Sequence, residues 1–384
     1  MKSDQVSMIT DACKKTIPTG CGNTPAGGPD KPPCCGPAVS TGGGEISEKV
    51  PGFQRWLETP VGNVPRISTE LGFSDQVGAC KARWGIGRMG YMVPPGLYAL
   101  GSPTAADPVV VTANYKMTYD IIRHTLTGRN VWLLVLETYG INVWCAAGKG
   151  TFGTDELVRR IAETGLAGVV SHRRLILPIL GATGVAAHEV TRRSGFSISF
   201  GTIRAADLPA YLDNGMLTTP AMREMTFTIY ERVILIPVEL VQALKSISLA
   251  GGGLFLLFYA LGGLVAGFTA FLAWLGAVLT GIVAGPLLLP WLPGRSFAVK
   301  GAVAGLAWVV LFCLDAGGSR WSAAVLAAAF VALPAVSAFY TMNFTGCTPF
   351  TSRSGVKREM RIALPAMGGA LVVGVVLLLA GRFM

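Results

Sequence analysis

Val131-Trp-Leu-Leu-Val-Leu136 is an uninterrupted apolar run, which is typical of a strand buried on both faces of a sheet. Similar strand candidates lie on either side of it, at Pro108–Thr112, Arg174–Leu180 and Phe196–Phe200. Helical spacing between them predicts helices over Lys116–Thr127, Asp155–Ala162 with Thr154 as N-cap, Val185–Arg193 and Ala206–Leu212. This alternation predicts an α/β fold with Rossmann-like winding and a mostly parallel sheet.

The rest of the chain divides by composition. Residues 1–50 are rich in Gly, Pro, Ser and Thr and are expected to form a flexible leader that contains cysteines. Residues 51–213 form the predicted α/β domain, although 51–105 give no clear assignment. Residues 214–247 are expected to be a linker in which Glu231–Lys245 lies along a membrane surface as an interfacial helix.

Residues 248–384 read as an all-α transmembrane domain of five helices. Only 14% of the chain is charged and the mean hydropathy is +0.51. Spans of about 20 apolar residues are predicted near 248–268, 270–291, 297–315, 321–341 and 363–381. Apart from Lys300 they hold almost no ionisable residue, which favours an anchor over a transporter.

Most of the formal net charge of +10 lies in this membrane half. Its basic residues fall mainly on the side of the α/β domain, as the positive-inside rule requires. We therefore expect a multi-pass protein of the cytoplasmic (inner) membrane, with the α/β domain on the cytoplasmic side and no nucleic-acid surface.

The loop after Leu136 is where a parallel sheet would place a ligand. It continues as Gly140-Ile-Asn-Val-Trp-Cys-Ala-Ala-Gly-Lys-Gly-Thr-Phe-Gly-Thr154. A phosphate loop is excluded because Gly148-Lys149 is followed by Gly150 and position 143 is Val. Taken alone, Cys145 could equally be a buried structural thiol.

Asn142-Val-Trp-Cys-Ala-Ala-Gly-Lys149 resembles the cap-helix signature of the corrinoid protein of the mercury-methylation pair. The likeness covers roughly residues 105–384, because Val111–Lys116, Leu177–Glu189, Met342–Ser352 and Gly355–Met360 also resemble segments of that family. Cys347 is a departure, since a small polar residue is expected there.

The resemblance implies a cobamide, a cobalamin-type corrinoid, held in the α/β domain with its nucleotide tail buried. Cys145 would be the catalytic residue and the lower axial ligand of cobalt, where a soft thiolate suits a transition metal. The implied activity is transfer of a methyl group, as a carbanion equivalent, to Hg(II) to give methylmercury. The implied electron donor is a ferredoxin-like protein with two [4Fe-4S] clusters, and the methyl donor could be a methyl-folate.

Residues around Cys145 carry weaker predictions. Trp144 could pack on the corrin or fill core, Asn142 could fix the cap by hydrogen bonds, and Lys149 could reach a corrin side chain or simply be solvated. His172 and His188 lack partners at ligand spacing and are not expected to bind metal. The predicted cofactor-binding residues are Asn142, Val143, Trp144, Cys145, Ala146, Ala147, Gly148, Lys149, Gly150, Gly181, Gly184 and Gly201.

The leader holds Cys13, Cys21, Cys34 and Cys35, without the Cys-x2-Cys spacing of an iron–sulfur site. No apolar signal segment precedes the α/β domain, so these thiols are expected to stay reduced. Our hypothesis is that Cys34 and Cys35 capture Hg(II) and pass it to the site.

Two other functions stay open. The first is a methyl carrier of the acetyl-CoA pathway, similar to the large subunit of the corrinoid iron–sulfur protein. That family shares the corrinoid fold but normally has a cysteine-clustered N-terminus, no membrane spans and no Cys in the cap. The second is a membrane metal-binding or transport protein.

Overall fold

The computed structural model describes residues 50–347 and 353–383. Its sheet has seven strands in the order β1-β2-β3-β5-β4-β6-β7. These are β1 (Phe53–Thr59), β2 (Gly62–Ile67), β3 (Gly96–Leu100), β4 (Val109–Ala113), β5 (Val131–Leu136), β6 (Arg174–Leu177) and β7 (Ser197–Phe200). The α/β class is confirmed, and the four strands expected from the sequence are β4 to β7.

The sheet is mixed rather than mostly parallel throughout. Strands β5, β4, β6 and β7 are mutually parallel, whereas β3 runs antiparallel to β5 and β1 antiparallel to β2. The antiparallel pairings all involve the segment 51–105, which carried no clear pattern. In the parallel half the chain starts at β4, moves outward to β5 and then crosses to β6, so the winding reverses between β4 and β6. This reversal is the topological switch point, where ligands bind outside the carboxyl ends of the strands.

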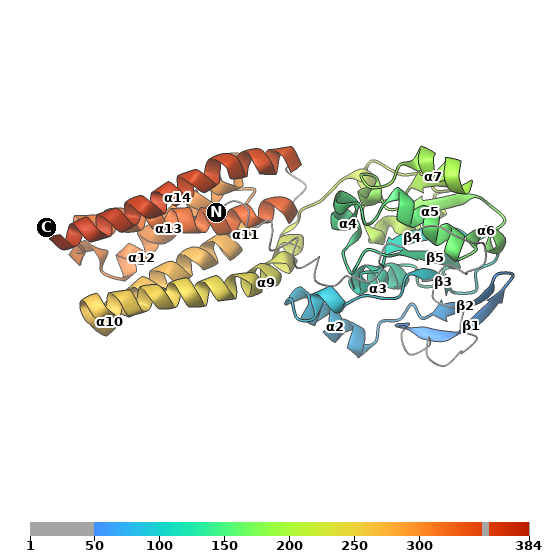
Figure 1. The fold of residues 1–384 in the computed structure, drawn as a ribbon, viewed down its shortest axis with the longest axis horizontal. Coiled ribbons are helices and arrows are strands. Elements are labelled where there is room, and N and C mark those ends of the chain that lie inside the picture. Colours follow the sequence, from blue (N-terminus) through green and yellow to red (C-terminus); the bar gives the residue numbers. More distant parts are fainter. Residues whose placement is uncertain (1–49, 348–352, 384) are drawn as a thin grey trace, which may run out of the picture. The chain divides into compact units, whose positions relative to one another are not determined.

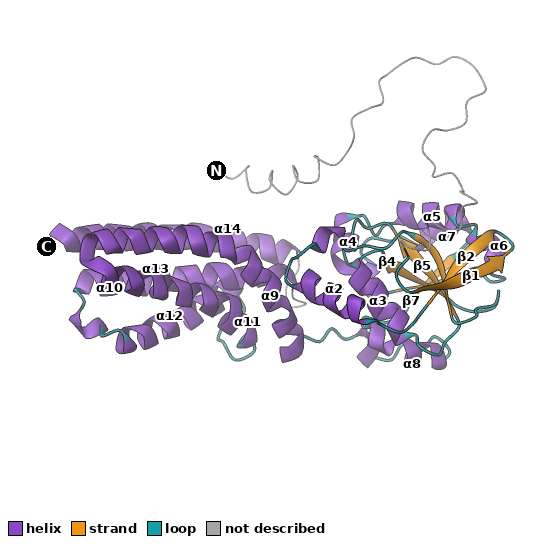
Figure 2. Ribbon diagram, turned by 90° about the horizontal axis from the view of Figure 1, so that it is seen from below, coloured by secondary structure: helices purple, strands orange, loops and turns teal. Residues whose placement is uncertain are grey.

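Helices cover both faces of the parallel half, as Figure 2 shows. Trp132, Leu134 and Leu136 of β5 point into a core with α4 (Val143–Lys149), α5 (Thr154–Glu163), α6 (Leu166–Val169) and α7 (Ala187–Ser194). The other residues of β5, which alternate with these three, point into a second core with α3 (Lys116–Thr125) and α8 (Leu208–Asp213). Burial on both faces explains why the run 131–136 contains no polar residue.

Thr154 does not cap α5, as the sequence had suggested. The N-cap is Gly153 and Thr154 is the first helical residue. The Thr154 hydroxyl accepts a hydrogen bond of 2.9 Å from the backbone N–H of Ala186. The Thr154 side chain therefore links α5 to the N-cap residue of α7, instead of capping its own helix.

A buried ion-pair cluster fastens α2 (Phe73–Arg83) and the segment before it to α3. The guanidinium of Arg123 is fully buried and donates to the carbonyls of Ser68 and Glu70 and to the carboxylates of Asp75 and Asp120. Lys116 bonds the same two carboxylates, at 2.5 and 2.6 Å. Because every charge has partners, the cluster avoids the large penalty of an unpaired buried ion.

Four helical stretches among the described residues are long and apolar enough to cross a membrane, which indicates membrane association. They are Ile229–Leu287, Phe297–Asp315, Ala323–Asn343 and Ser354–Gly381. They comprise α9 (Ile229–Ser246), α10 (Gly252–Leu279), α11 (Gly285–Leu287), α12 (Phe297–Asp315), α13 (Ala323–Asn343) and α14 (Arg353–Phe383).

The first stretch contains the first predicted span, most of the second, which was expected to reach residue 291, and also Glu231–Lys245. It is not one straight helix, because Gly262 and Gly263 leave the helical conformation, with φ of 78° at Gly263. The two arms then lie side by side, since a Cβ on Gly267 would come within 3.0 Å of the Phe255 carbonyl oxygen (Figure 1). The chain turns six residues earlier than the predicted boundary near residue 269, at two adjacent glycines, the residue type that most readily adopts a positive φ.

Candidate functional site

Cys145 lies in the first turn of α4, on its exposed face. The side-chain oxygen of Asn142 accepts a hydrogen bond from the backbone N–H of Cys145 at 3.0 Å and so caps the helix. Val143, Ala146 and Ala147 face the core, whereas Cys145, Gly148 and Lys149 face outward. Gly150 ends the helix in the left-handed region, with φ of 85°. The thiol is therefore presented on a short helix whose two ends are both fixed.

The loop that delivers α4 is held by Asn114, which follows β4 and is 1% exposed. Its amide oxygen accepts hydrogen bonds from the backbone N–H of Thr138 (3.1 Å) and of Gly140 (3.2 Å). Its amide nitrogen donates to the Glu137 carboxylate at 2.6 Å. Tyr139 and Gly140 both have positive φ, of 56° and 69°. The buried amide thus fixes a strained turn that sets where α4 begins.

The inner side of α4 rests on two glycines that the sequence had proposed as cofactor contacts. A Cβ on Gly184 would lie 2.2 Å from the Phe152 carbonyl oxygen and 2.9 Å from the Ala147 Cα. A Cβ on Gly181 would lie 2.6 Å from the Phe152 ring. Any side chain at either position would push against the segment that carries Cys145. The structure therefore gives both glycines a packing role behind the helix.

A cavity of about 200 Å³ lies at the carboxyl ends of β4 and β6, beside the start of α4. Asn142, Val143 and Trp144 line it from α4, and Thr112, Pro178 and Thr202 line it from the strand ends. The Thr112 hydroxyl is buried and has no hydrogen-bond partner among the described residues. A buried hydroxyl without a partner is costly unless a ligand satisfies it.

These residues fit a corrinoid group in two ways. The outer face of α4 is open, because nothing lies within 4 Å of a Cβ built on Gly148, so a flat macrocycle could approach the Cys145 thiol. The neighbouring cavity is mostly apolar, and its unpartnered Thr112 hydroxyl could bond a polar tail. Cys145 would supply the sulfur ligand to cobalt.

Other predicted residues are placed differently. Gly201 packs against Ile176 and Tyr211 and does not line the cavity. Ala146 and Ala147 are buried beneath α4, and Lys149 is exposed. Cys34 and Cys35 lie outside the described residues, as do Cys13 and Cys21. Sequence reasoning missed Thr112, Asn114 and Thr138, although Thr112 and Asn114 fall inside the Val111–Lys116 segment that had been singled out.

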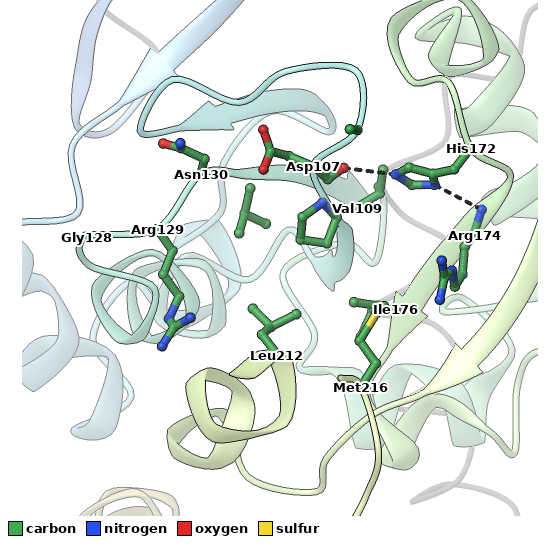
Figure 3. A pocket seen from close by; sticks show the side chains of 13 residues that line it. Asp107, Val109, Gly128, Arg129, Asn130, His172, Arg174, Ile176, Leu212 and Met216 are labelled. Atoms are coloured by element: carbon green, nitrogen blue, oxygen red, sulfur yellow. Dashed lines mark hydrogen bonds between the residues drawn. The ribbon is translucent and has the colours of Figure 1, made fainter. Parts of the chain in front are cut away.

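The two histidines are not brought into the site. His172 lies at the amino ends of the strands, in a separate cavity of about 420 Å³ (Figure 3). Its ring is engaged by the Asp107 carbonyl oxygen at 2.9 Å and by the backbone N–H of Arg174 at 3.2 Å. His188 is exposed on α7. The described residues contain no group of three or more His, Cys, Asp or Glu arranged to hold a metal ion.

The part of the chain that carries this site is similar to known proteins. A family model described as CO dehydrogenase/acetyl-CoA synthase delta subunit matches residues 87–206. That range contains α4, Asn114 and all of the cavity lining except Leu208, and it ends before the four stretches that are long and apolar enough to cross a membrane.

Two relatives match over nearly the same length. The acetyl-CoA decarbonylase/synthase complex subunit gamma of Methanopyrus kandleri is 32% identical over 123 residues, which is 32% of this chain and 26% of that protein. The subunit of the same name from Methanocaldococcus jannaschii is 33% identical over 124 residues, covering 32% and 25%. The chain thus spans about a quarter of the length of these relatives.

Proposed function

We propose that this protein is a membrane-anchored corrinoid methyltransferase that converts Hg(II) to methylmercury, with Cys145 as the lower ligand of cobalt. The observation that carries the proposal is the exposed thiol on α4, beside a cavity at the switch point of the parallel strands. The similarity of residues 87–206 to subunits of the acetyl-CoA decarbonylase/synthase complex supports a role in methyl transfer.

Each residue around the thiol has a defined task in this proposal. Asn142 fixes the first turn of α4 and hence the height of the Cys145 sulfur above the sheet. Asn114 holds the turn before it, so that α4 does not need to reorganise when the cofactor binds. Thr112 gives the cavity a hydroxyl that can bond the nucleotide tail. Preorganisation of this kind lowers the cost of binding.

When bound, a cobamide would supply a cobalt-bound methyl group whose bonding electrons can pass to an electrophile. The Cys145 thiolate, a soft and strongly donating ligand, would favour departure of the methyl group as a carbanion equivalent toward Hg(II). We propose a two-cluster ferredoxin-like protein as the donor of the two electrons that would return the bound cofactor to the state that accepts a methyl group. A methyl-folate is the proposed source of the methyl group.

We further propose that the two arms around Gly262–Gly263 cross the bilayer separately, which would give five crossings. The arms are long enough, since Ile229–Leu287 contains 59 residues and a crossing needs about 20. With the α/β domain in the cytoplasm, Arg295, Lys357 and Arg358 would lie on the cytoplasmic side, in agreement with the positive-inside rule.

A second candidate is a methyl carrier of the acetyl-CoA pathway, and the comparisons favour it over any role unrelated to corrinoids. Two features of this chain favour the mercury reaction instead. A cysteine stands on the exposed face of α4, and four helical stretches are able to span a membrane.

The test is anaerobic methylation of Hg(II) by membranes that contain this chain and its ferredoxin. We expect methylmercury from the wild type and from Cys80→Ala, because Cys80 is an exposed thiol on α2, outside the site. We expect at least a hundredfold less from Cys145→Ala, in line with the loss of one key ligand or its support. Full activity in Cys145→Ala would refute the mechanism, and methyl transfer to an acetyl-CoA synthase but not to Hg(II) would favour the second candidate.

A further inference from the structure

The membrane half contains a groove that the proposed methyl transfer does not use. Helix α13 packs against α12 on one side and α14 on the other. A groove of about 840 Å³ lies between α12 and α14, with α13 as its floor. Alanines from all three helices line it: Ala298 and Ala302 on α12, Ala335 and Ala338 on α13, and Ala363, Ala366 and Ala370 on α14. Because these side chains are short, the space between the helices stays open to a slender apolar ligand.

The length of the groove matches one leaflet of a bilayer. On α14 the lining runs from Gly355 to Ala370, roughly 22 Å at about 1.5 Å per residue, which is about half of the 40–45 Å that a bilayer measures with its headgroup regions. The hydrocarbon core of a bilayer is about 30 Å thick. The groove therefore extends from the end of one leaflet to near the middle of the membrane, which is the depth that a single acyl chain occupies.

One end of the groove is positively charged. Arg295 and Arg358 line this end, and both side chains are exposed. Neither forms an ion pair with any residue that the structure describes. Guanidinium groups match the geometry of a phosphate, to which they can donate two hydrogen bonds at once.

The only acidic group among the lining residues is already engaged. The Glu359 carboxylate accepts hydrogen bonds of 2.8 Å from the Ser296 hydroxyl and of 2.8 Å from the backbone N–H of Ala298. It therefore fastens the first turn of α12 to α14. Two guanidinium groups against one carboxylate leave a net positive charge at this end.

We infer that the groove between α12 and α14 binds one acyl chain of an acidic phospholipid, with its phosphate at Arg295 and Arg358. A helix from a second copy of this chain could fill the apolar part of the groove, but it would match the charged end poorly. From Ser248 onward the sequence offers only two acidic residues, Asp315 and Glu359, to pair with the arginines. An acidic lipid satisfies both the apolar walls and the charged end.

The inference is tested on the purified full-length protein by native mass spectrometry from mixed micelles. Phosphatidylglycerol and phosphatidylcholine with identical acyl chains are titrated separately, and lipid adducts per chain are counted. The wild type is expected to retain one phosphatidylglycerol with an affinity about tenfold or more above that for phosphatidylcholine, given two arginines near the phosphate. Arg295→Gln/Arg358→Gln should remove this preference.

A matched pair of alanine variants separates the groove from the general membrane surface. Ala366→Leu fills the groove and should lose the retained lipid, whereas Ala307→Leu, exposed on α12 outside the groove, should behave as the wild type. Circular dichroism confirms that both variants are folded. The inference is overturned if the wild type retains the two lipids equally or if Ala366→Leu keeps the lipid. It is also overturned if added inorganic phosphate displaces the bound lipid as effectively as added phosphatidylglycerol does.

Discussion

The side-chain oxygen of Asn142 accepts a hydrogen bond of 3.0 Å from the backbone N–H of Cys145. Both residues lie at the start of α4, so a single bond both caps the helix and fixes the residue that carries the thiol. Because α4 runs only from Val143 to Lys149, it has few internal hydrogen bonds and depends on its caps.

Asn142→Ala should loosen α4, whereas Asn142→Asp should preserve it, because Asp is as good an N-cap as Asn. The loss of the cap costs about 1 kcal/mol of helix stability, so amide exchange in residues 143–149 should accelerate roughly fivefold. Hydrogen exchange with peptide mapping measures this. Thr228→Ala, which removes the N-cap of α9, is the control and should leave α4 unchanged. Equal exchange in the Ala and Asp variants would contradict the capping role.

Asn114→Ala should destabilise the α/β domain, because it leaves the buried N–H groups of Thr138 and Gly140 without their acceptor. The expected loss is about 2–3 kcal/mol, the usual cost of unsatisfied buried groups. Urea unfolding of the full chain, followed by circular dichroism, gives the value. Asn130→Ala is the comparison, since the Asn130 side chain accepts from the exposed backbone N–H of Ser102, and it should cost clearly less. Similar losses in the two variants would show that Asn114 has no special role in the turn.

Thr112→Val should leave the stability of the cofactor-free protein unchanged or slightly higher. The substitution removes a buried hydroxyl that has no partner among the described residues and keeps the side-chain shape. Cobamide retention should fall by about fivefold to tenfold, the value of one hydrogen bond to the ligand. Cobalt content after anaerobic gel filtration, measured beside the unfolding midpoint, separates the two effects. Unchanged cobalt content would remove Thr112 from the site.

Acid should weaken the attachment of α2 to α3 through Asp75. Partial burial would raise the pKa of the Asp75 carboxyl, but the hydrogen bond and charge of Lys116, with the charge of Arg123, outweigh it and lower the pKa. A lowered folded-state pKa contributes stability above the unfolded pKa of about 3.9, and this contribution disappears as the pH falls through the folded pKa. Stability of the wild type should therefore drop more steeply below about pH 4 than that of Asp75→Asn.

Asp213 offers a contrast for the same titration. The bidentate bond from Arg129 lowers its pKa as well, but the Asp213 carboxyl is exposed. Salt at about 0.5 M should suppress the contribution of this surface pair and leave that of Asp75 largely intact. If Asp75→Asn and the wild type show the same slope below pH 4, the cluster does not contribute through Asp75.

The parallel half of the fold could be predicted from the sequence because its strands are buried on both faces. Val131–Leu136 has the predicted limits, and Pro108–Thr112 differs from β4 by one residue at each end. The strands β1 and β2 were not predicted because most of their residues are exposed or only partly buried, so neither strand has a clear apolar period. The wrong N-cap at Thr154 arose because the hydroxyl bonds a distant residue, Ala186, which no local pattern reveals.

The site was predictable only in part, for a similar reason. Cys145 could be singled out because it follows a buried strand within a distinctive motif. The supporting roles of Asn114 and Thr112 depend on contacts across the sheet, since Asn114 bonds residues more than 20 positions away. Gly181 and Gly184 were expected to contact the cofactor, and only the three-dimensional packing shows that a Cβ at either position would face Phe152.

The proposed function requires that the Cys145 sulfur bind the cobalt of a cobamide. Cobalt K-edge X-ray absorption on the anaerobically purified, cobamide-loaded full-length protein tests it most directly. We expect one sulfur neighbour of cobalt in the wild type and in Cys80→Ala, and none in Cys145→Ala. A wild type without a sulfur neighbour, or a Cys145→Ala variant that keeps one, would contradict it.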